Sequence, residues 1–347
     1  MPLNKTASFV SVVVPMRNEA PHIEKCIRSL IDQDYPTNLY EVLVVDGMSN
    51  DHSKKTAQAI SDNYPNIFLL ENPGILTSFG LNIGIRKSKG EIVIILGGHS
   101  FVQNDFISKN AEFIKKNERH CVGGPIETLG ETHNAKVISL AVSSPFGVGD
   151  ALFRYGKSEA YVDTVAFGAY KKEVFEKIGL FDEELARNQD DEFNYRLRKA
   201  GGKIFITPEI KSSYYSRATL RKLWSQYFQY GFWKIRVLQK HPKMMRLRQF
   251  IPGVFVLSVI LSFGLAFYHY IFGCLTLIIL GSYVGCNLLL SLRIARKEGL
   301  KCLPLLPAAF SAMHFSYGIG SLTGLIRFFP KWFQKEIGSP KLSDIET

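Results

Sequence analysis

The order of apolar and polar positions from Phe9 to Lys116 is that of alternating strands and helices. Short β-branched runs predict strands, and segments with an apolar side chain at every third or fourth position predict helices. The expected strands are 9–15, 41–46, 66–70 and 91–96, and the expected helices are 19–31, 53–61, 76–87 and 105–116. Such alternation indicates a parallel sheet covered by helices.

The pattern from Cys121 to Lys211 is less regular, and it predicts one clear helix at 190–200 that ends at two glycines. The next segment, Leu220–Lys240, interleaves aromatic side chains with Arg and Lys. This composition favours an amphipathic helix that lies at a membrane surface. A helix packed on the domain core is the alternative.

The C-terminal part of the chain contains long apolar runs. Between Ile251 and Leu292, His269 is the only residue among the Asp, Glu, Lys, Arg and His types. One membrane pass takes about 20 apolar residues, so this run predicts two passes that meet near Tyr268–Tyr270. A further apolar run, 303–326, contains two prolines and several glycines. We expect a third pass there, with a re-entrant segment as the alternative.

The formal net charge of +11 is concentrated beside these apolar runs. The basic residues that precede the first pass and follow the second are Lys234, Arg236, Lys240, Lys243, Arg246, Arg248, Arg293, Arg296, Lys297 and Lys301. Because positive loops stay in the cytoplasm, we expect both ends of the hairpin and the N-terminal domain there. A third pass conflicts with this rule, since it places the basic residues that follow the third run outside the cytoplasm. No nucleic-acid-binding module accompanies the charge, so the expected partner is membrane lipid or a lipid phosphate.

The remaining composition supports an intracellular membrane protein. The polar N-terminus does not resemble a signal peptide. Five scattered cysteines without a CxxC motif favour reduced thiols over disulfides or a zinc site. The expected organisation is a cytoplasmic domain at 1–217, amphipathic interfacial helices at 218–248, a membrane region of two to three passes at 249–327 and a tail at 328–347.

Polar residues follow the first two predicted strands, at the edge where parallel sheets bind ligands. The first strand is followed by Pro15, Arg17, Asn18 and Glu19, and the second by Asp46, Gly47, Ser49 and Asp51. Asp46 is placed to accept hydrogen bonds from a ribose or a base. Asn18 and Glu19 have an alternative role as caps of the next helix, and Asp51 is expected to be an N-cap. Gly74 follows the third strand within a glycine-rich run that extends to Gly90, which is weak evidence by itself.

The fourth strand ends at Gly97, Gly98 and His99, without a carboxylate. Two glycines indicate a sharp turn or a close approach to the backbone. Further along, Asp190, Asp191 and Glu192 open the helix predicted at 190–200. One carboxylate suits a helix N-terminus, but three adjacent ones repel each other, so one of them is a candidate general base.

Taken together, these motifs resemble the inverting glycosyltransferases of family 2, which have the GT-A fold, over residues 9–235. Within that family the chain is most similar to the membrane-anchored enzymes of bacterial exopolysaccharide assembly, of the succinoglycan ExoA type. This closer resemblance is carried by VVDGMSNDHS (44–53), SPFGVGDALFRYG (144–156), VDTVAFGAYKKEVFEKIGLFDE (162–183) and NQDDEFNYRLRKAGGKI (188–204).

The resemblance implies an α/β GT-A domain with a Rossmann-like, mostly parallel sheet, followed by transmembrane helices. It implies a nucleotide-sugar donor, usually a UDP-sugar, and a lipid-linked saccharide acceptor. The residues it assigns to the donor are Pro15, Arg17, Asn18, Glu19, Asp46, Gly47, Ser49, Gly74, Gly97, Gly98 and His99. It makes Asp190 the general base, with Asp191 as the second choice. Gln189 stands where the family has glutamate.

The resemblance also raises the question of a metal, because the family's fourth strand ends in Asp-x-Asp or Asp-x-His. Here the first position is Gly97 and the third is His99. A divalent metal, Mn²⁺ or Mg²⁺, would have His99 as its one protein ligand, and an imidazole suits Mn²⁺ better. A metal-free site, with His99 or a basic side chain on the diphosphate, is one alternative. Loss of catalysis is another.

Three rival functions follow from the same residues. A processive polysaccharide synthase is disfavoured, since the segment Gln226–Lys234 lacks the Gln-x-x-Arg-Trp signature and three passes are too few for a channel. A catalytically degenerate scaffold for a glycan assembly complex is supported by Gly97. A polyprenyl-phosphate sugar synthase, with a bare lipid phosphate as acceptor, is the third rival.

Overall fold

The computed structural model describes residues 7–116, 118–333 and 338–343, which form two compact units. The first unit contains residues 7–127, 152–215 and 338–343, and the second contains 128–151 and 216–333. The N-terminal domain expected over 1–217 is therefore interrupted in the sequence at 128–151. Part of the tail expected at 328–347 lies outside the described residues.

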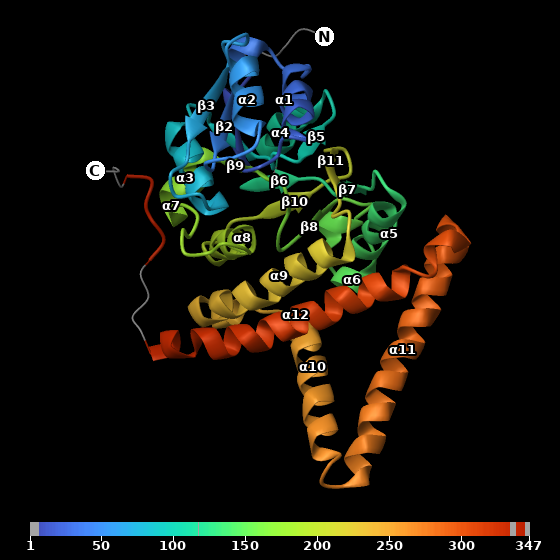
Figure 1. Cartoon of the computed structure of the whole chain (residues 1–347). Helices are drawn as coiled ribbons and strands as arrows, with labels where there is room; N and C mark the ends of the chain where they lie inside the picture. Colours follow the sequence, from blue (N-terminus) through green and yellow to red (C-terminus); the bar gives the residue numbers. More distant parts are fainter. Residues whose placement is uncertain (1–6, 117, 334–337, 344–347) are drawn as a thin grey trace. The chain divides into compact units, whose positions relative to one another are not determined.

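The first unit is built on an eight-stranded sheet in the order β3-β2-β1-β4-β9-β6-β10-β8 (Figure 1). Its strands are β1 Val10–Met16, β2 Tyr40–Asp46, β3 Ile67–Glu71, β4 Ile92–Ile95, β6 Cys121–Gly123, β8 Ala160–Tyr161, β9 Ala169–Lys171 and β10 Ile204–Ile206. Strands β1 to β4 are parallel, whereas β9 runs antiparallel to both of its neighbours. This mixed sheet confirms the expected α/β fold.

Helices cover both faces of this sheet, because successive residues of a strand point to opposite sides. They are α1 Ile23–Ile31, α2 Ser53–Ser61, α3 Thr77–Lys87, α4 Phe106–Lys115, α7 Lys172–Ile178 and α8 Gln189–Lys199, with single 3₁₀ turns η1 Thr37–Leu39 and η2 Leu152–Arg154. On β1, Val12 and Val14 belong to the core beneath α1 and α4, whereas Val13 belongs to the core beneath α3, α7 and α8. Each expected helix is present to within a few residues.

A second, smaller sheet was not predicted from the sequence. It consists of β5 Ser100–Val102, β11 Ser212–Tyr215 and β7 Ile126–Leu129, in the order β5-β11-β7. Strands of three or four residues are too short to show an alternating pattern. Because β5 begins directly after His99, the sheet brings Tyr214 of β11 opposite Ser100.

The second unit is organised around two long helices, α9 Leu220–Lys240 and α12 Leu306–Phe328, which lie side by side (Figure 1). Their backbones touch at glycines. A Cβ atom added to Gly231 would lie 2.1 Å from the carbonyl oxygen of Tyr317, and one added to Gly320 would lie 2.2 Å from that of Phe228. The short helices α5 His133–Val142 and α6 Pro145–Val148 pack on α12, and the 3₁₀ turns of this unit are η3 Pro242–Met244, η4 Leu300–Cys302 and η5 Phe329–Phe333.

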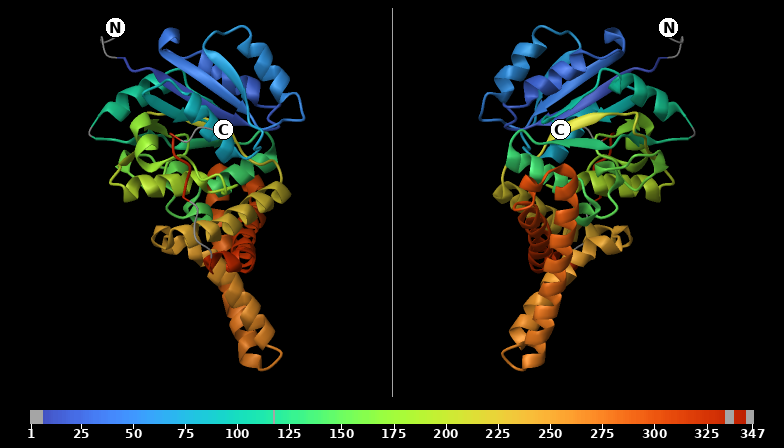
Figure 2. Two further views of the ribbon diagram at one scale, coloured as in Figure 1. Left: turned by 90° about the vertical axis from the view of Figure 1, so that its left-hand side faces the viewer. Right: turned by 90° about the vertical axis from the view of Figure 1, so that its right-hand side faces the viewer.

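Two helices of the described chain, α10 Leu247–Leu265 and α11 Tyr270–Glu298, are long and apolar enough to cross a membrane. They form the hairpin expected from the sequence, which projects as a narrow pair in Figure 2. Inside the hairpin, the Thr276 hydroxyl donates a hydrogen bond of 2.8 Å to that of Ser262. Most of the large apolar side chains on both helices are exposed.

The expected third pass stays a prediction. Within the described residues, α12 is not among the helices that are long and apolar enough to cross a membrane. Its buried side includes Phe310, Ser316 and Ser321, and it packs against α9, α10 and α5. Part of the apolar run at 303–326 therefore packs on protein.

Candidate functional site

The loops after β1 and β2 are joined by hydrogen bonds around Asn18. Its backbone has a φ of 55°, its N–H donates to the Ser49 hydroxyl at 2.9 Å, and its side-chain oxygen accepts from the Asn50 N–H at 2.9 Å. The N-cap of α1 is His22. The interpretation of Asn18 and Glu19 as helix caps is therefore wrong, and Asn18 instead connects the two strand ends.

Asp46 is buried beneath this connection, with 1% of its surface exposed. Its carboxylate accepts a hydrogen bond from the Ser49 N–H, with both oxygens within 3.3 Å of the nitrogen. A Cβ atom on Gly47 would lie 2.8 Å from the carbonyl oxygen of Ile75, so Gly47 permits the close approach of the turn that contains Gly74. The structure thus brings the ends of β1, β2 and β3 together, and it gives Asp46 a role in shaping the β2 end.

Asp51 does not occupy the N-cap position of α2, which is His52. Its carboxylate accepts hydrogen bonds from the N–H groups of Ser53 at 2.9 Å and of Ala20 at 3.2 Å. Desolvation opposes ionisation, but the hydrogen bonds from Ser53 and Ala20 outweigh it, and the pKa of Asp51 is lowered. Asp51 therefore fixes the approach to α1 against the start of α2.

The two glycines after β4 allow close backbone packing. A Cβ atom on Gly98 would lie 3.0 Å from the Cβ of Met16, at the end of β1. One on Gly97 would lie 3.3 Å from the ring of Phe167, and the Gly97 carbonyl is 3.8 Å from the Cys26 sulfur. The β4 end is therefore packed directly against the β1 end, as the close-approach interpretation predicts.

His99 lies where these strand ends meet. Its Nδ1 is 3.2 Å from Oε1 of Glu19, and its ring meets that of Tyr214 edge-on at a centroid distance of 5.8 Å. The side chains of His99 and Glu19 remain 30% and 23% exposed. The β1 end and the β4 end therefore share a polar group that solvent, and a ligand, can reach.

Helix α8 carries the three carboxylates in three different environments. Glu192 is buried, and its two oxygens accept hydrogen bonds from the Arg196 guanidinium at 2.6 and 2.9 Å. Arg196 also donates to the carbonyl of Leu180 at 2.6 Å. Glu192 is therefore structural and is excluded as a general base, whereas Asp190 is exposed and Asp191 is half-exposed.

The sheet whose strand β4 leads to His99 also positions α8. Tyr170 on β9, the strand next to β4, donates a hydrogen bond of 2.9 Å to Asn194 of α8, and Asn194 donates one of 2.8 Å to Thr164. Burial raises the pKa of Tyr170 well above its usual value, with a smaller contribution from the charge of Asp190. Asp190 and Asp191 thus begin a helix that is anchored to the sheet through buried polar contacts.

Comparison with known proteins identifies the family. The model of the family described as "Glycosyl transferase family 2" matches residues 11–179. The chain is 31% identical over 335 residues to a dolichyl N-acetyl-alpha-D-glucosaminyl phosphate 3-beta-D-2,3-diacetamido-2,3-dideoxy-beta-D-glucuronosyltransferase of Methanococcus voltae, covering 92% of this chain and 98% of that one. The chain belongs to glycosyl transferase family 2. It is also 30% identical over 252 residues to the succinoglycan biosynthesis protein ExoA of Rhizobium meliloti (strain 1021), covering 72% of this chain and 76% of that one.

A solved structure agrees with the fold of this family 2 glycosyltransferase. The mannosyltransferase PcManGT from Pyrobaculum calidifontis, in complex with GDP-Man and Mn²⁺, superposes with a TM-score of 0.58 over 92% of this chain and 88% of that one. The two sequences are 18% identical. The likeness establishes the GT-A fold.

The residues of this glycosyltransferase fit a metal only if the nucleotide supplies most of the ligands. Within the described residues, three or more His, Cys, Asp or Glu side chains do not gather into a metal-binding group. At the β4 end, His99 offers one imidazole, and Glu19 lies on its other nitrogen. One imidazole together with phosphate oxygens is a donor set that suits Mn²⁺.

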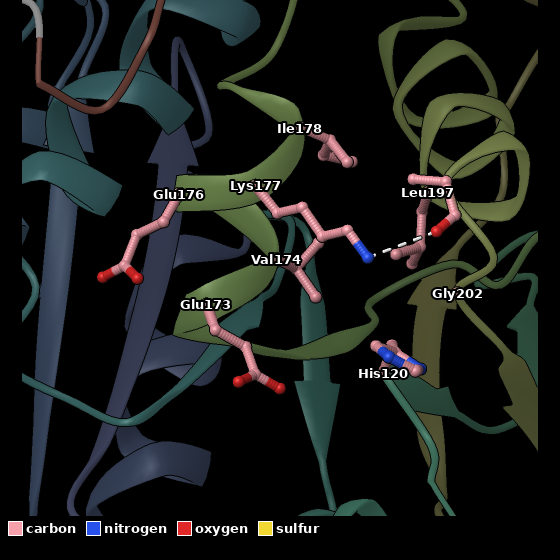
Figure 3. A pocket seen from close by; sticks show the side chains of 9 residues that line it. His120, Glu173, Val174, Glu176, Lys177, Ile178, Leu197 and Gly202 are labelled. Carbon is pink, nitrogen blue, oxygen red and sulfur yellow. Dashed lines mark hydrogen bonds between the residues drawn. The ribbon is translucent and has the colours of Figure 1, made fainter.

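A pocket of about 490 Å³ in the glycosyltransferase lies away from these residues (Figure 3). It is lined by α7 and the end of α8, and Lys177 donates a hydrogen bond of 3.3 Å to the Ala200 carbonyl there. His120 and Gly202, which also line it, precede β6 and β10. Since β6 and β10 run in the same direction as β4, the pocket lies at the amino edge of the sheet, opposite His99.

Sequence reasoning missed three side chains at the carboxyl edge. Tyr214 contacts His99, the Arg154 guanidinium lies 5.2 Å from the centre of the Tyr214 ring, and Phe167 faces Gly97. Arg154 and Phe167 belong to the segments 144–156 and 162–183 that carry the family resemblance. The family resemblance of those two segments indicated that they contribute to the site, but it did not indicate which residue in each faces the site.

Proposed function

We propose that this glycosyltransferase transfers a sugar from a UDP-sugar to a lipid-linked saccharide, with inversion at the anomeric carbon, in the synthesis of a cell-surface glycan. The observation that supports it best is the set of polar groups at one sheet edge, where Glu19 and His99 meet between two strand ends. Sheets of this kind bind ligands at that edge.

The donor's nucleotide occupies the ends of β1 and β2 in this proposal. Arg17 and Asn18 are exposed there, beside Pro15 at the end of β1. Ser49 is held by the Asn18 N–H and the Asp46 carboxylate, and the Gly47 N–H donates to the Met16 carbonyl. Asp46 is buried, so its contact with the nucleotide requires the 47–49 loop to move. The diphosphate then extends toward Gly97, Gly98 and His99.

The chemistry is a single displacement. The acceptor hydroxyl oxygen attacks the anomeric carbon, the bond from that carbon to the diphosphate oxygen breaks, and the electron pair leaves with the nucleoside diphosphate. The hydroxyl proton passes to the carboxylate of Asp190, which is exposed at the first turn of α8. Asp191 is the second choice for this role.

His99 is the residue that would hold a divalent metal on the diphosphate. Such a metal, when bound, offsets the negative charge that grows on the leaving nucleoside diphosphate. The PcManGT structure contains Mn²⁺ with its nucleotide-sugar, which supports testing Mn²⁺ first.

The acceptor is assigned from the membrane helices and from the relative in Methanococcus voltae, whose name specifies a dolichyl phosphate sugar. Helices α10 and α11 anchor the enzyme as a hairpin in the cell membrane, and basic residues at both ends of the hairpin keep the catalytic domain in the cytoplasm. The amphipathic helix α9 lies at the membrane surface, where an acceptor with a lipid tail is available.

The test uses the full chain purified in detergent. Radiolabelled UDP- and GDP-sugars are supplied in turn with a microbial lipid extract, and label in the organic phase is counted for the wild type and for Asp190→Asn. The proposal expects one UDP-sugar to label a lipid that already carries a sugar, and expects the variant to lose this activity. Label on a bare polyprenyl phosphate would instead identify a polyprenyl-phosphate sugar synthase, and label released only as free sugar would contradict transfer to lipid.

A further inference from the structure

We propose that Glu19 is a positioning residue for His99, and that its carboxylate holds Nδ1 so that Nε2 would be available to a divalent metal on the diphosphate. This inference rests on the proposed function, because it concerns the same site. In this inference Glu19, in the loop after β1, orients His99, the candidate metal ligand after β4. In the sequence the two residues are 80 positions apart.

The carboxylate determines which ring nitrogen carries the proton. An ionised carboxylate only accepts hydrogen bonds, so at 3.2 Å from Oε1 the Nδ1 atom must be the donor. In a neutral imidazole the other nitrogen, Nε2, then keeps its lone pair, which is the form that binds a metal. Carboxylate–histidine pairs of this kind orient metal ligands and increase their basicity.

The position of Glu19 is rigid enough for this role. Its N–H donates a hydrogen bond of 2.7 Å to the Ser53 hydroxyl at the start of α2. Its carbonyl accepts hydrogen bonds from the N–H groups of His22 and Ile23 at 2.8 and 2.9 Å, where α1 begins. The backbone of Glu19 is thus fixed between two helices, and only its side chain reaches the imidazole.

The two glycines of the β4 end lie directly against the pair. A Cβ atom on Gly98 would be in van der Waals contact with Cγ of Glu19 at 3.5 Å, and one on Gly97 would be in van der Waals contact with Cε1 of His99 at 3.5 Å. On its other side, His99 is bounded by the ring of Tyr214. At Gly97 the carboxylate that the family resemblance leads one to expect is missing. Glu19 restores one negative charge next to the imidazole from a different strand end.

The test separates metal binding from nucleotide binding. Mn²⁺ is titrated into the full chain in detergent with UDP present, and free Mn²⁺ is measured by its EPR signal. UDP affinity is measured separately in EDTA by calorimetry. For Glu19→Gln we expect Mn²⁺ affinity to fall by about tenfold or more, the usual cost of losing such a partner, with UDP affinity in EDTA unchanged. Glu24→Gln is the matched control, since Glu24 pairs with Arg28 on the surface of α1.

A double variant decides whether Glu19 acts through His99. If it does, adding Glu19→Gln to His99→Ala causes no further loss of Mn²⁺ affinity. A further tenfold loss would make Glu19 a direct ligand and overturn the positioning role. Equal weakening of UDP binding in EDTA and in Mn²⁺ would overturn it too, as would an unchanged Mn²⁺ affinity or a wild type that binds no Mn²⁺. None of these results decides the sugar transfer, which the lipid-labelling assay measures independently.

Discussion

Glu192 and Arg196 form a bidentate ion pair within α8. The Arg196 guanidinium also donates hydrogen bonds to the carbonyls of Ile178 and Leu180, which precede α8 in the chain. Two positions earlier on the same helix, Asp190 is exposed. Neighbouring carboxylates on one turn are therefore divided between holding the helix in place and facing solvent.

This division predicts effects of different size on stability. Glu192→Gln leaves Arg196, whose side chain is only 13% exposed, without its counter-charge, and the loss of one partner of a buried pair costs on the order of 3 kcal/mol. Asp190→Asn, at an exposed position, keeps the side-chain oxygen that accepts a hydrogen bond from the Asp191 N–H, so it should lower stability much less. Thermal unfolding of both variants in detergent checks this, and a Glu192→Gln protein as stable as the wild type would show that the pair has no structural role.

Asp190→Asn should reduce turnover by about 100- to 10,000-fold, the usual contribution of a general base. Affinity for the donor should not change, because the carboxylate acts on the acceptor hydroxyl. Asp191→Asn should have a much smaller effect. Turnover and UDP binding measured on the same preparations give the comparison, and near-normal turnover of Asp190→Asn would refute the assignment of the base.

His99→Ala should lower turnover far more than Gly97→Ala does. Loss of one group that stabilises charge on a leaving group costs on the order of 100-fold. A methyl group at Gly97 would lie 3.3 Å from the edge of the Phe167 ring, which requires only a small shift. Steady-state rates of the two variants test the role of His99, and small, equal effects would remove it.

The thiol of Cys26 should be unreactive in the folded enzyme. Burial, with a smaller contribution from the charge of Glu19, raises the pKa of Cys26 to about 12. Since the reactive thiolate forms only as the pH rises toward that value, iodoacetamide at pH 8.5 should not modify Cys26 until the protein is unfolded in denaturant. Peptide mapping by mass spectrometry measures this. Rapid alkylation of the native protein would show that the thiol beneath Gly97 is accessible.

The contact between α9 and α12 predicts a difference between two glycines in long helices. Gly320→Ala places a methyl group 2.2 Å from the carbonyl of Phe228, and overpacking of this kind costs about 1–3 kcal/mol. Gly281→Ala on α11 is the matched control, because nothing lies within 4 Å of the added atom. Unfolding midpoints in detergent should fall for the first variant only. Equal midpoints would show that α12 does not pack on α9 in this way.

Much of the fold was predictable because its elements are long and have clear ends. The bounds expected for α2 and α9 agree with the structure, and at α9 the Thr219 side chain accepts a hydrogen bond from the first turn. The strands of three residues, such as β9, were not predicted, since their pairing is decided by distant neighbours. The third pass stays a prediction, because a hydropathy pattern does not show whether small and apolar residues meet lipid or another helix.

The site was predictable in its parts but not in its connections. The strand ends indicated His99 and Glu19 separately, whereas their contact depends on how β1 and β4 pair in the sheet. The sequence also left three carboxylates as candidates on α8. The spacing of Glu192 and Arg196, four positions apart, was a sign that this carboxylate is paired, although its burial depended on the packing of α8.

The most direct test of the whole proposal is nucleotide release by the purified chain with its best donor and a lipid extract, measured in Mn²⁺ and then in EDTA. We predict release of UDP that requires Mn²⁺ and stops in EDTA. Release that continues in EDTA would contradict the metal role of His99. Measurable binding of nucleotide-sugars without any release, for every donor, would contradict the proposed transfer reaction.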